Sequence, residues 1–250
     1  MSQYLSGSFY FLTDKGRMRE INEDAARGAI NAYGNVFLVV ADGMGGHLKG
    51  EYASNELVDY LIKSFRDVDE EFKNIKVASK WLNKAISEAN KKIYQASQKN
   101  AQYQGMGTTL SACLIIKDQM IIAQIGDSRI YHLADNKLEQ ITVDQTYVNY
   151  LINTKKLSPE EANAHPERHK LTNALGTKPT VNVDLSTYPY NKEKLLLCSD
   201  GLYNNVPVKD IFSILKGNDS LERKCLQLIA FGNANGGSDN MAVIIWEANN

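Results

Sequence analysis

Four aspartates stand at the ends of apolar segments, each beside glycine or a small polar residue. One segment, Val36–Ala41, is typical of a buried strand and ends abruptly in Asp42-Gly43. A carboxylate beside an exposed glycine carbonyl offers the hard oxygen ligands that magnesium and manganese prefer. A solvated turn explains any one of these pairs equally well, but gathered carboxylates need cations to offset their repulsion. The recurrence favours a divalent-metal site, and the four residues are Asp42, Asp127, Asp200 and Asp239.

A second group of charges lies in the stretch 15–26, where Arg19 stands shortly before Glu23 and Asp24. Paired acids close to an arginine suit a site that needs both metal ligands and a clamp for phosphate oxygens. A solvated polar loop is the alternative interpretation.

The composition is that of an ordinary globular protein. The 250 residues are 43% hydrophobic and 23% charged, and the formal net charge is −1. Nothing here indicates non-specific nucleic-acid binding. Three cysteines lie in apolar surroundings without metal-ligand spacing, and we expect them to be reduced core residues. We see no signal peptide after Met1 and no apolar run of membrane-spanning length, so we expect a cytoplasmic protein that does not bind membranes.

Periodicity predicts the elements that position these acids. The fourfold spacing of Ala53, Leu57, Leu61 and Phe65 predicts a helix over 49–65, and a similar stripe predicts another over 77–97. Two further helices are expected at 207–215 and 220–231. Strands are expected at 7–13, 36–41, 110–116, 120–125, 130–133, 138–141, 181–188, 194–199 and 241–246. This order predicts a single α+β domain of antiparallel sheets covered by helices.

A long polar excursion at about 145–170 interrupts the strands. Its Ser158-Pro159 pair resembles a helix start, and it contains His165 and His169 without a recognisable metal-ligand spacing. We interpret it as a mobile flap at the mouth of a site, with a simple surface excursion as the alternative.

Seven motifs in this order resemble those of the type 2C protein phosphatases, the metal-dependent serine/threonine phosphatases, in their compact bacterial form. The motifs are Arg19-x-x-Asn22-Glu23-Asp24, Asp42-Gly43-Met44-Gly45-Gly46-His47, Gly105-x-Gly107-Thr108-Thr109, Gly126-Asp127-Ser128-Arg129, Leu171-Thr172-x-Ala174-Leu175-Gly176, Ser199-Asp200-Gly201-Leu202 and Asp239-Asn240. The resemblance implies a four-layer α-β-β-α sandwich, two antiparallel sheets flanked by helix pairs, in which residues 1–250 form one catalytic domain with a flap at 145–170.

The resemblance also implies a centre of two manganese or magnesium ions. By this resemblance Asp42 bridges the ions, the carbonyl of Gly43 binds one of them, and Asp200 and Asp239 bind the other. Arg19 matches the arginine that binds the substrate phosphate.

Three more acids have implied roles. Glu23 and Asp24 act on the first ion, directly or through water, and Asp127 with the aspartate at 200 holds a weaker third ion. Tyr203, with the two asparagines after it, departs from the family pattern. We expect no effect on the chemistry there, because no implied ligand is missing.

The chemistry of such a centre is hydrolysis of phosphoserine and phosphothreonine. Two ions activate a bridging water or hydroxide for direct in-line attack and neutralise phosphate oxygens, so no cysteine nucleophile is needed. His47 is the nearest titratable residue to the Asp42 loop and a candidate general acid, although a metal-bound water would serve equally. We expect phosphorylated protein substrates, among them a serine/threonine kinase, and a monomeric enzyme. The rival hypothesis is a metal-bound phosphoprotein-binding module without turnover.

Overall fold

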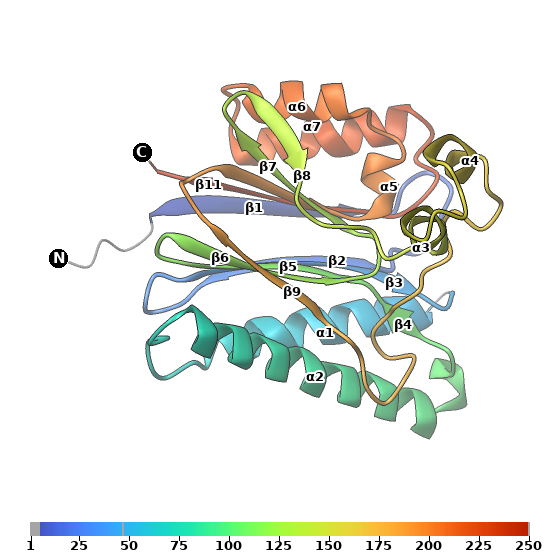
Figure 1. Ribbon diagram of the computed structural model, residues 1–250, viewed down its shortest axis with the longest axis horizontal. Helices are drawn as coiled ribbons and strands as arrows, with labels where there is room; N and C mark the ends of the chain where they lie inside the picture. Colours follow the sequence, from blue (N-terminus) through green and yellow to red (C-terminus); the bar gives the residue numbers. More distant parts are fainter. Residues whose placement is uncertain (1–5, 47, 250) are drawn as a thin grey trace.

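Four layers make up the computed structural model, which describes residues 6–46 and 48–249 (Figure 1). One sheet has the strand order β1 (Gly7–Asp14), β11 (Met241–Ala248), β10 (Lys194–Cys198), β7 (Arg129–Ala134) and β8 (Lys137–Gln140). The other has the order β2 (Asp24–Ile30), β3 (Val36–Met44), β5 (Leu110–Ile116), β6 (Gln119–Ile125) and β9 (Asp184–Pro189), with short β4 (Gly107–Thr108) on β3. All pairings are antiparallel, as expected for this fold class.

Two helix pairs form the outer layers. Helices α1 (Leu48–Arg66) and α2 (Ile75–Lys99) cover the β3 sheet, and α6 (Val208–Lys216) and α7 (Leu221–Ala234) cover the β11 sheet. The shorter helices are η1 (Ala101–Tyr103), α3 (Tyr147–Asn153), α4 (Pro159–Asn163) and α5 (Asp200–Tyr203). The predicted four-layer α+β sandwich is confirmed.

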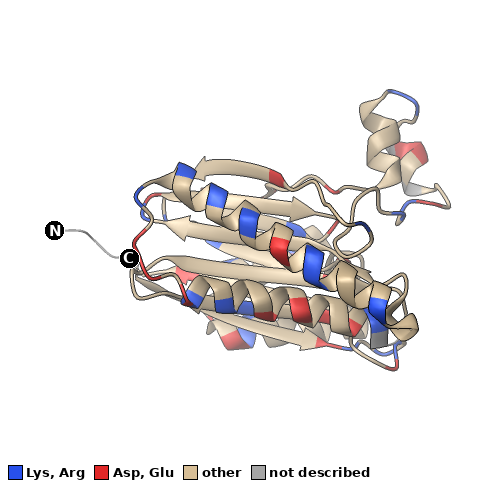
Figure 2. Ribbon diagram, turned by 90° about the horizontal axis from the view of Figure 1, so that it is seen from below, with Lys and Arg blue, Asp and Glu red and all other residues tan. Residues whose placement is uncertain are grey.

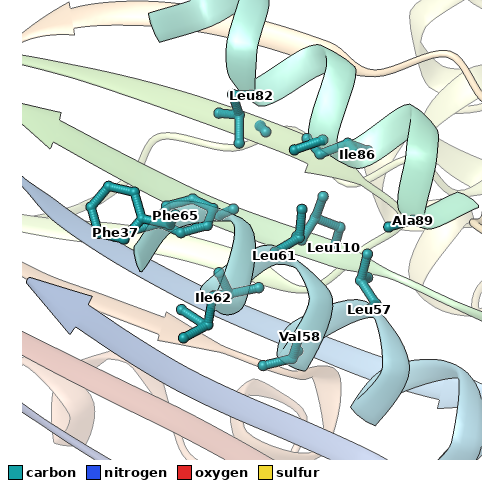
Figure 3. Packing of buried hydrophobic residues seen from close by; sticks show 14 of the residues in the cluster. Phe37, Leu57, Val58, Leu61, Ile62, Phe65, Leu82, Ile86, Ala89 and Leu110 are labelled. Carbon is teal, nitrogen blue, oxygen red and sulfur yellow. The ribbon is translucent and has the colours of Figure 1, made fainter. Parts of the chain in front are cut away.

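Three apolar layers hold these elements together, one between the sheets and one under each helix pair. Under the first pair, Leu57, Leu61 and Phe65 from α1 meet Leu82 and Ile86 from α2 (Figure 3). These are the residues whose helical spacing predicted the two helices, so the stripe is a packing surface.

Strand β2 was not among the predicted strands, and its first residues, 24–26, lie in the stretch for which a polar loop was the alternative interpretation. The strand is Asp-Ala-Ala-Arg-Gly-Ala-Ile, in which the last residue alone is β-branched and none is aromatic, so most of the residues typical of strands are missing. Gly28 lies directly against the Phe9 ring of the opposite sheet, where a Cβ would collide. Close packing therefore requires glycine at position 28, which is one reason that the usual strand signal is weak here.

The excursion at 145–170 contains both α3 and α4, and only the second was anticipated. Ser158 forms a capping box with Glu161 at the start of α4. The two helices project beyond the sheets at one end of the molecule, away from both termini (Figures 1 and 2).

The three cysteines, Cys113, Cys198 and Cys225, are buried and free. No helix among the described residues is long and apolar enough to cross a membrane.

Candidate metal centre

Asp24 and Asp42 are brought together by the β2–β3 ladder, in which they are direct partners. The Asp24 carboxylate accepts a buried hydrogen bond of 2.6 Å from Ser199 Oγ, which follows β10 in the other sheet. The backbone of Asp42 is fixed by Thr109, whose Oγ1 accepts from the Asp42 amide at 2.9 Å. The Asp42 carbonyl accepts from the Thr109 amide, also at 2.9 Å. These bonds hold a pair of carboxylates at the strand ends.

Asp200 and Asp239 come from the opposite sheet, where Asp200 starts α5 after β10 and Asp239 precedes β11. The Asn240 side chain joins this edge to the loop that contains Arg19. Its Oδ1 accepts from the Glu23 amide at 2.8 Å, and its Nδ2 donates to the carbonyls of Lys15 and Ile21 at 2.8 Å each. Asn240 is thus a positioning residue that the sequence analysis did not single out, although it stood within a quoted motif.

Glu23 lies at the junction of β3 and α1. Its carboxylate Oε1 accepts from the Gly50 amide at 3.2 Å, and its carbonyl accepts from the Gly43 amide at 3.1 Å. Gly43 and Gly50 face each other so closely that a Cβ on either would collide with backbone atoms. The missing side chains let the first turn of α1 approach the Gly43 peptide, which is the predicted carbonyl ligand.

Asp127 follows Gly126, whose φ of +90° turns the chain after β6. Its neighbours hold it through the backbone. The Gly126 amide donates to Gln145 Oε1 at 3.1 Å, the Gln145 amide donates to the Gly126 carbonyl at 2.8 Å, and Tyr203 donates to the Asp127 carbonyl at 3.2 Å. The Asp127 side chain is buried and faces the same cavity as Asp42.

One cavity of about 600 Å³ collects these groups at the end of the sheets. Asp24 does not line it and lies behind, against Ser199. His169, Lys178 and Thr180 also line the cavity, and no motif spacing singled them out. The predicted site residues that line it are Arg19, Glu23, Asp42, Gly43, Asp127, Asp200 and Asp239. His47, the candidate general acid, lies outside the described residues.

Burial and mutual repulsion make the ionised forms of these acids unfavourable. Burial, together with the charges of Asp200 and Asp239, raises the pKa of Asp24 to about 8 against the hydrogen bond from Ser199. Burial and the Asp200 charge raise the pKa of Asp127 to about 7. Burial raises the pKa of Asp42 and of Asp200 as well, with further contributions from neighbouring aspartates. A bound cation would relieve the repulsion that causes part of these shifts.

Arg19 forms an ion pair with one of the predicted metal ligands, Asp239. Its Nη2 lies 2.8 Å from Asp239 Oδ2 in an ion pair at the rim, where both side chains remain more than one-third exposed. A guanidinium binds phosphate oxygens as readily as it binds carboxylates. The Arg19 guanidinium, which also lines the cavity, is thus a group of the kind that could bind an anion there.

The donor set fits magnesium or manganese. Among the described residues, no three or more acidic, histidine or cysteine side chains converge as the ligands of one ion would. Magnesium, however, is commonly held by one or two carboxylates, with water and other oxygens completing the octahedron. The carboxylates that line the cavity and the peptide of Gly43 offer oxygens of this kind, so the residues present suit hard divalent ions without an all-protein cage.

The comparisons with known proteins agree on one family. The family model described as protein phosphatase 2C matches residues 15–231. The serine/threonine phosphatase Stp of Listeria welshimeri is 40% identical over 96% of this chain and 95% of its own. Among solved structures, the serine/threonine phosphatase Stp1 from Staphylococcus aureus matches with a TM-score of 0.91 and 36% identity, covering 100% of this chain and 98% of that one.

A third match bears on metal binding. The catalytic domain of the phosphatase PstP, solved in complex with two manganese ions, has a TM-score of 0.85 and 31% identity over 98% of this chain and 100% of its own. The chain belongs to the protein phosphatase 2C family and is an enzyme of the metal-dependent serine/threonine phosphatase class.

Proposed function

We propose that this enzyme hydrolyses phosphoserine and phosphothreonine in proteins by direct attack of water at phosphorus. The observation that supports this most strongly is the set of buried, mutually repelling carboxylates around one cavity, with an arginine at its rim. The carboxylates of such a site attract hard cations, and the cations together with the arginine attract an anionic substrate group. Manganese or magnesium would supply an activated water and neutralise phosphate charge.

The residues have separate roles in this proposal. Asp42, near the end of β3, would serve both ions, the Gly43 carbonyl would contribute to one site, and Asp200 and Asp239 would contribute to the other. Glu23 and Asp24 hold the first ion directly or through water, and Asp24 is held by Ser199. Asp127 and Asp200, which line the same cavity, would hold a weaker third ion.

Arg19 binds the substrate phosphate. Its guanidinium leaves Asp239 and forks onto two phosphate oxygens, which orients phosphorus for in-line displacement. The departing serine or threonine oxygen needs a proton, and His47 or a water in the cavity would deliver it.

We place phosphorylated proteins of the cytoplasm among the substrates, including a serine/threonine kinase, and expect the enzyme to act as a monomer. This part of the proposal is supported by the family resemblance. The flap at 145–170 borders the cavity through His169 and provides a surface for protein substrates.

Phosphopeptide hydrolysis tests the proposal. With Mn²⁺ present, the wild-type enzyme should release phosphate from phosphothreonine and phosphoserine peptides, with little release from a matched phosphotyrosine peptide. Chelation should stop release, and added Mn²⁺ should restore it. Turnover that survives chelation would contradict the metal-dependent mechanism. Metal-dependent peptide binding without turnover would instead support the phosphoprotein-binding alternative.

A further inference from the structure

Tyr203 connects two of the predicted metal-ligand segments. It is the last residue of α5, the helix that begins at Asp200. Its phenol Oη donates to the Asp127 carbonyl at 3.2 Å, 76 residues away in the chain. The side chain is therefore attached to Asp200 through one turn of helix and to Asp127 through one hydrogen bond.

Arg129 stacks on one face of the Tyr203 ring. The guanidinium carbon of Arg129 lies 3.5 Å from the ring centroid, a close stacking distance. Arg129 is itself fixed by Asp144, to which Nε donates at 3.0 Å and Nη2 at 2.7 Å. Both side chains of this pair are largely buried, with 23% and 10% of their surfaces exposed. The ring consequently has one well-defined position.

The base of the flap completes this arrangement on the other side of Asp127. Gln145, the residue after Asp144, exchanges two hydrogen bonds with Gly126. Its carbonyl also accepts from the amide and hydroxyl of Thr172, where the flap ends. The peptide groups at 126 and 127 are therefore held between the flap base and Tyr203.

We propose that Tyr203 is a positioning residue for the weak metal site, holding the Asp127 backbone at a fixed separation from Asp200. The proposal rests on the proposed function, which assigns Asp127 and Asp200 to a third ion. It revises the expectation that the unusual residue after the Asp-Gly-Leu motif has no chemical effect. The phenol binds no metal in this account, and it acts only through the peptide that precedes Ser128.

The test compares two tyrosines that contact the same arginine. Tyr203→Phe removes the hydrogen bond to the Asp127 carbonyl and keeps the ring under Arg129. Tyr131→Phe is the matched control, because Tyr131 is buried and its hydroxyl accepts from Arg129 Nη1 at 3.1 Å, whereas the bond to the Asp127 carbonyl comes from Tyr203. Each metal-stripped variant is titrated with Mn²⁺ alone by calorimetry, with Asp127→Ala as the reference lacking the weak site. Thermal unfolding of each variant checks the fold.

We expect Tyr203→Phe to weaken the weakest Mn²⁺ site by roughly three- to tenfold, the effect of losing one hydrogen bond. The tighter sites and the unfolding temperature should match those of Tyr131→Phe. A uniform loss of affinity at all sites, or equal titrations for the two phenylalanine variants, would overturn the inference. A wild-type titration that Asp127→Ala does not change would overturn it too, while leaving the two-metal reaction intact. Absence of Mn²⁺-dependent phosphatase activity in the wild type would instead contradict the proposed function.

Discussion

Burial raises the pKa of several carboxyl groups at this site and so favours their neutral form. Because a cation binds the ionised form, metal binding is coupled to proton release. Asp24 illustrates the effect, because its pKa is raised to about 8 from an ordinary value of 3.8, mainly by burial. The folded state then binds that proton more tightly than the unfolded chain does. The stability from this group is complete below about pH 4 and is lost as the pH rises to about 8.

Asp24→Asn should therefore stabilise the metal-free protein at high pH, because the amide stays neutral and still accepts from Ser199. We expect a gain of at least about 1 kcal/mol at pH 8 and little gain at pH 4. Urea unfolding in chelator at both pH values measures the difference, with exposed Asp59→Asn as the control. Equal gains at both pH values would contradict the linkage.

Arg19 pairs with Asp239, which we propose as a metal ligand, so Arg19→Ala should have two opposite effects. Substrate capture should fall, seen as a lower kcat/KM on a phosphothreonine peptide, because the fork onto phosphate is lost. Mn²⁺ affinity should rise slightly, by no more than about fivefold, since exposed ion pairs are weak. Arg17→Ala, on the same loop, is the control. Weaker Mn²⁺ binding in Arg19→Ala would indicate that the arginine supports the metal site.

At the scale of elements, the sequence predicted those helices and strands that have a regular spacing of apolar residues. Strand β3 and helices α1 and α2 followed from apolar spacing, and the place of the four aspartates at strand ends indicated the acids that line the cavity. Strand β2 could not be found this way, because it is rich in alanine, and the glycine at position 28 is required by a contact with Phe9 of the other sheet. The contacts of Asn240 with Lys15 and of Tyr203 with Asp127 join distant segments, and no local pattern reports such pairs.

The close contact between β3 and α1 can be tested by adding a Cβ atom at Gly50. Gly50→Ala would place a Cβ against the Glu23 carboxylate and the Gly43 peptide. We expect a loss of about 1–3 kcal/mol in unfolding free energy and weaker Mn²⁺ binding. Gly217→Ala, at the end of α6 and remote from the site, should leave Mn²⁺ binding unchanged. Denaturation and calorimetry together make the comparison, and normal metal binding in Gly50→Ala would contradict the role of this contact.

The flap should affect protein substrates more than small ones. Its helices project from the end of the sheets, and His169 lines the cavity. Replacing residues 163–169 with a neutral linker should change kcat/KM on a phosphorylated protein severalfold more than on a small aryl phosphate. An Asn-Gly turn in place of residues 135–136, between β7 and β8, is the control. An unchanged ratio of the two kcat/KM values would make the segment a surface excursion only, and equal collapse would mean that it supports the metal site.

For the molecule as a whole, the site is a junction between two sheets. Asp24 and Asp42 come from the β3 sheet, and Asp200 and Asp239 flank strands of the other. The apolar layer between the sheets must therefore hold the two carboxylate pairs together against their repulsion. Ions that bind both pairs should stabilise the folded protein, by about 2.7 kcal/mol at a concentration one hundred times the dissociation constant.

The most direct test of the central claim is phosphate release from a phosphothreonine peptide as a function of Mn²⁺ concentration, for the wild type and Asp42→Asn. Asp59→Asn is the control for the loss of one negative charge. We predict that the wild type and the control saturate alike, and that Asp42→Asn remains at least about one hundredfold slower even at saturating Mn²⁺, corresponding to about 2.7 kcal/mol of lost transition-state stabilisation. An Asp42→Asn enzyme that turns over near the wild-type rate would contradict the assignment of Asp42 to the metal centre and the mechanism built on it.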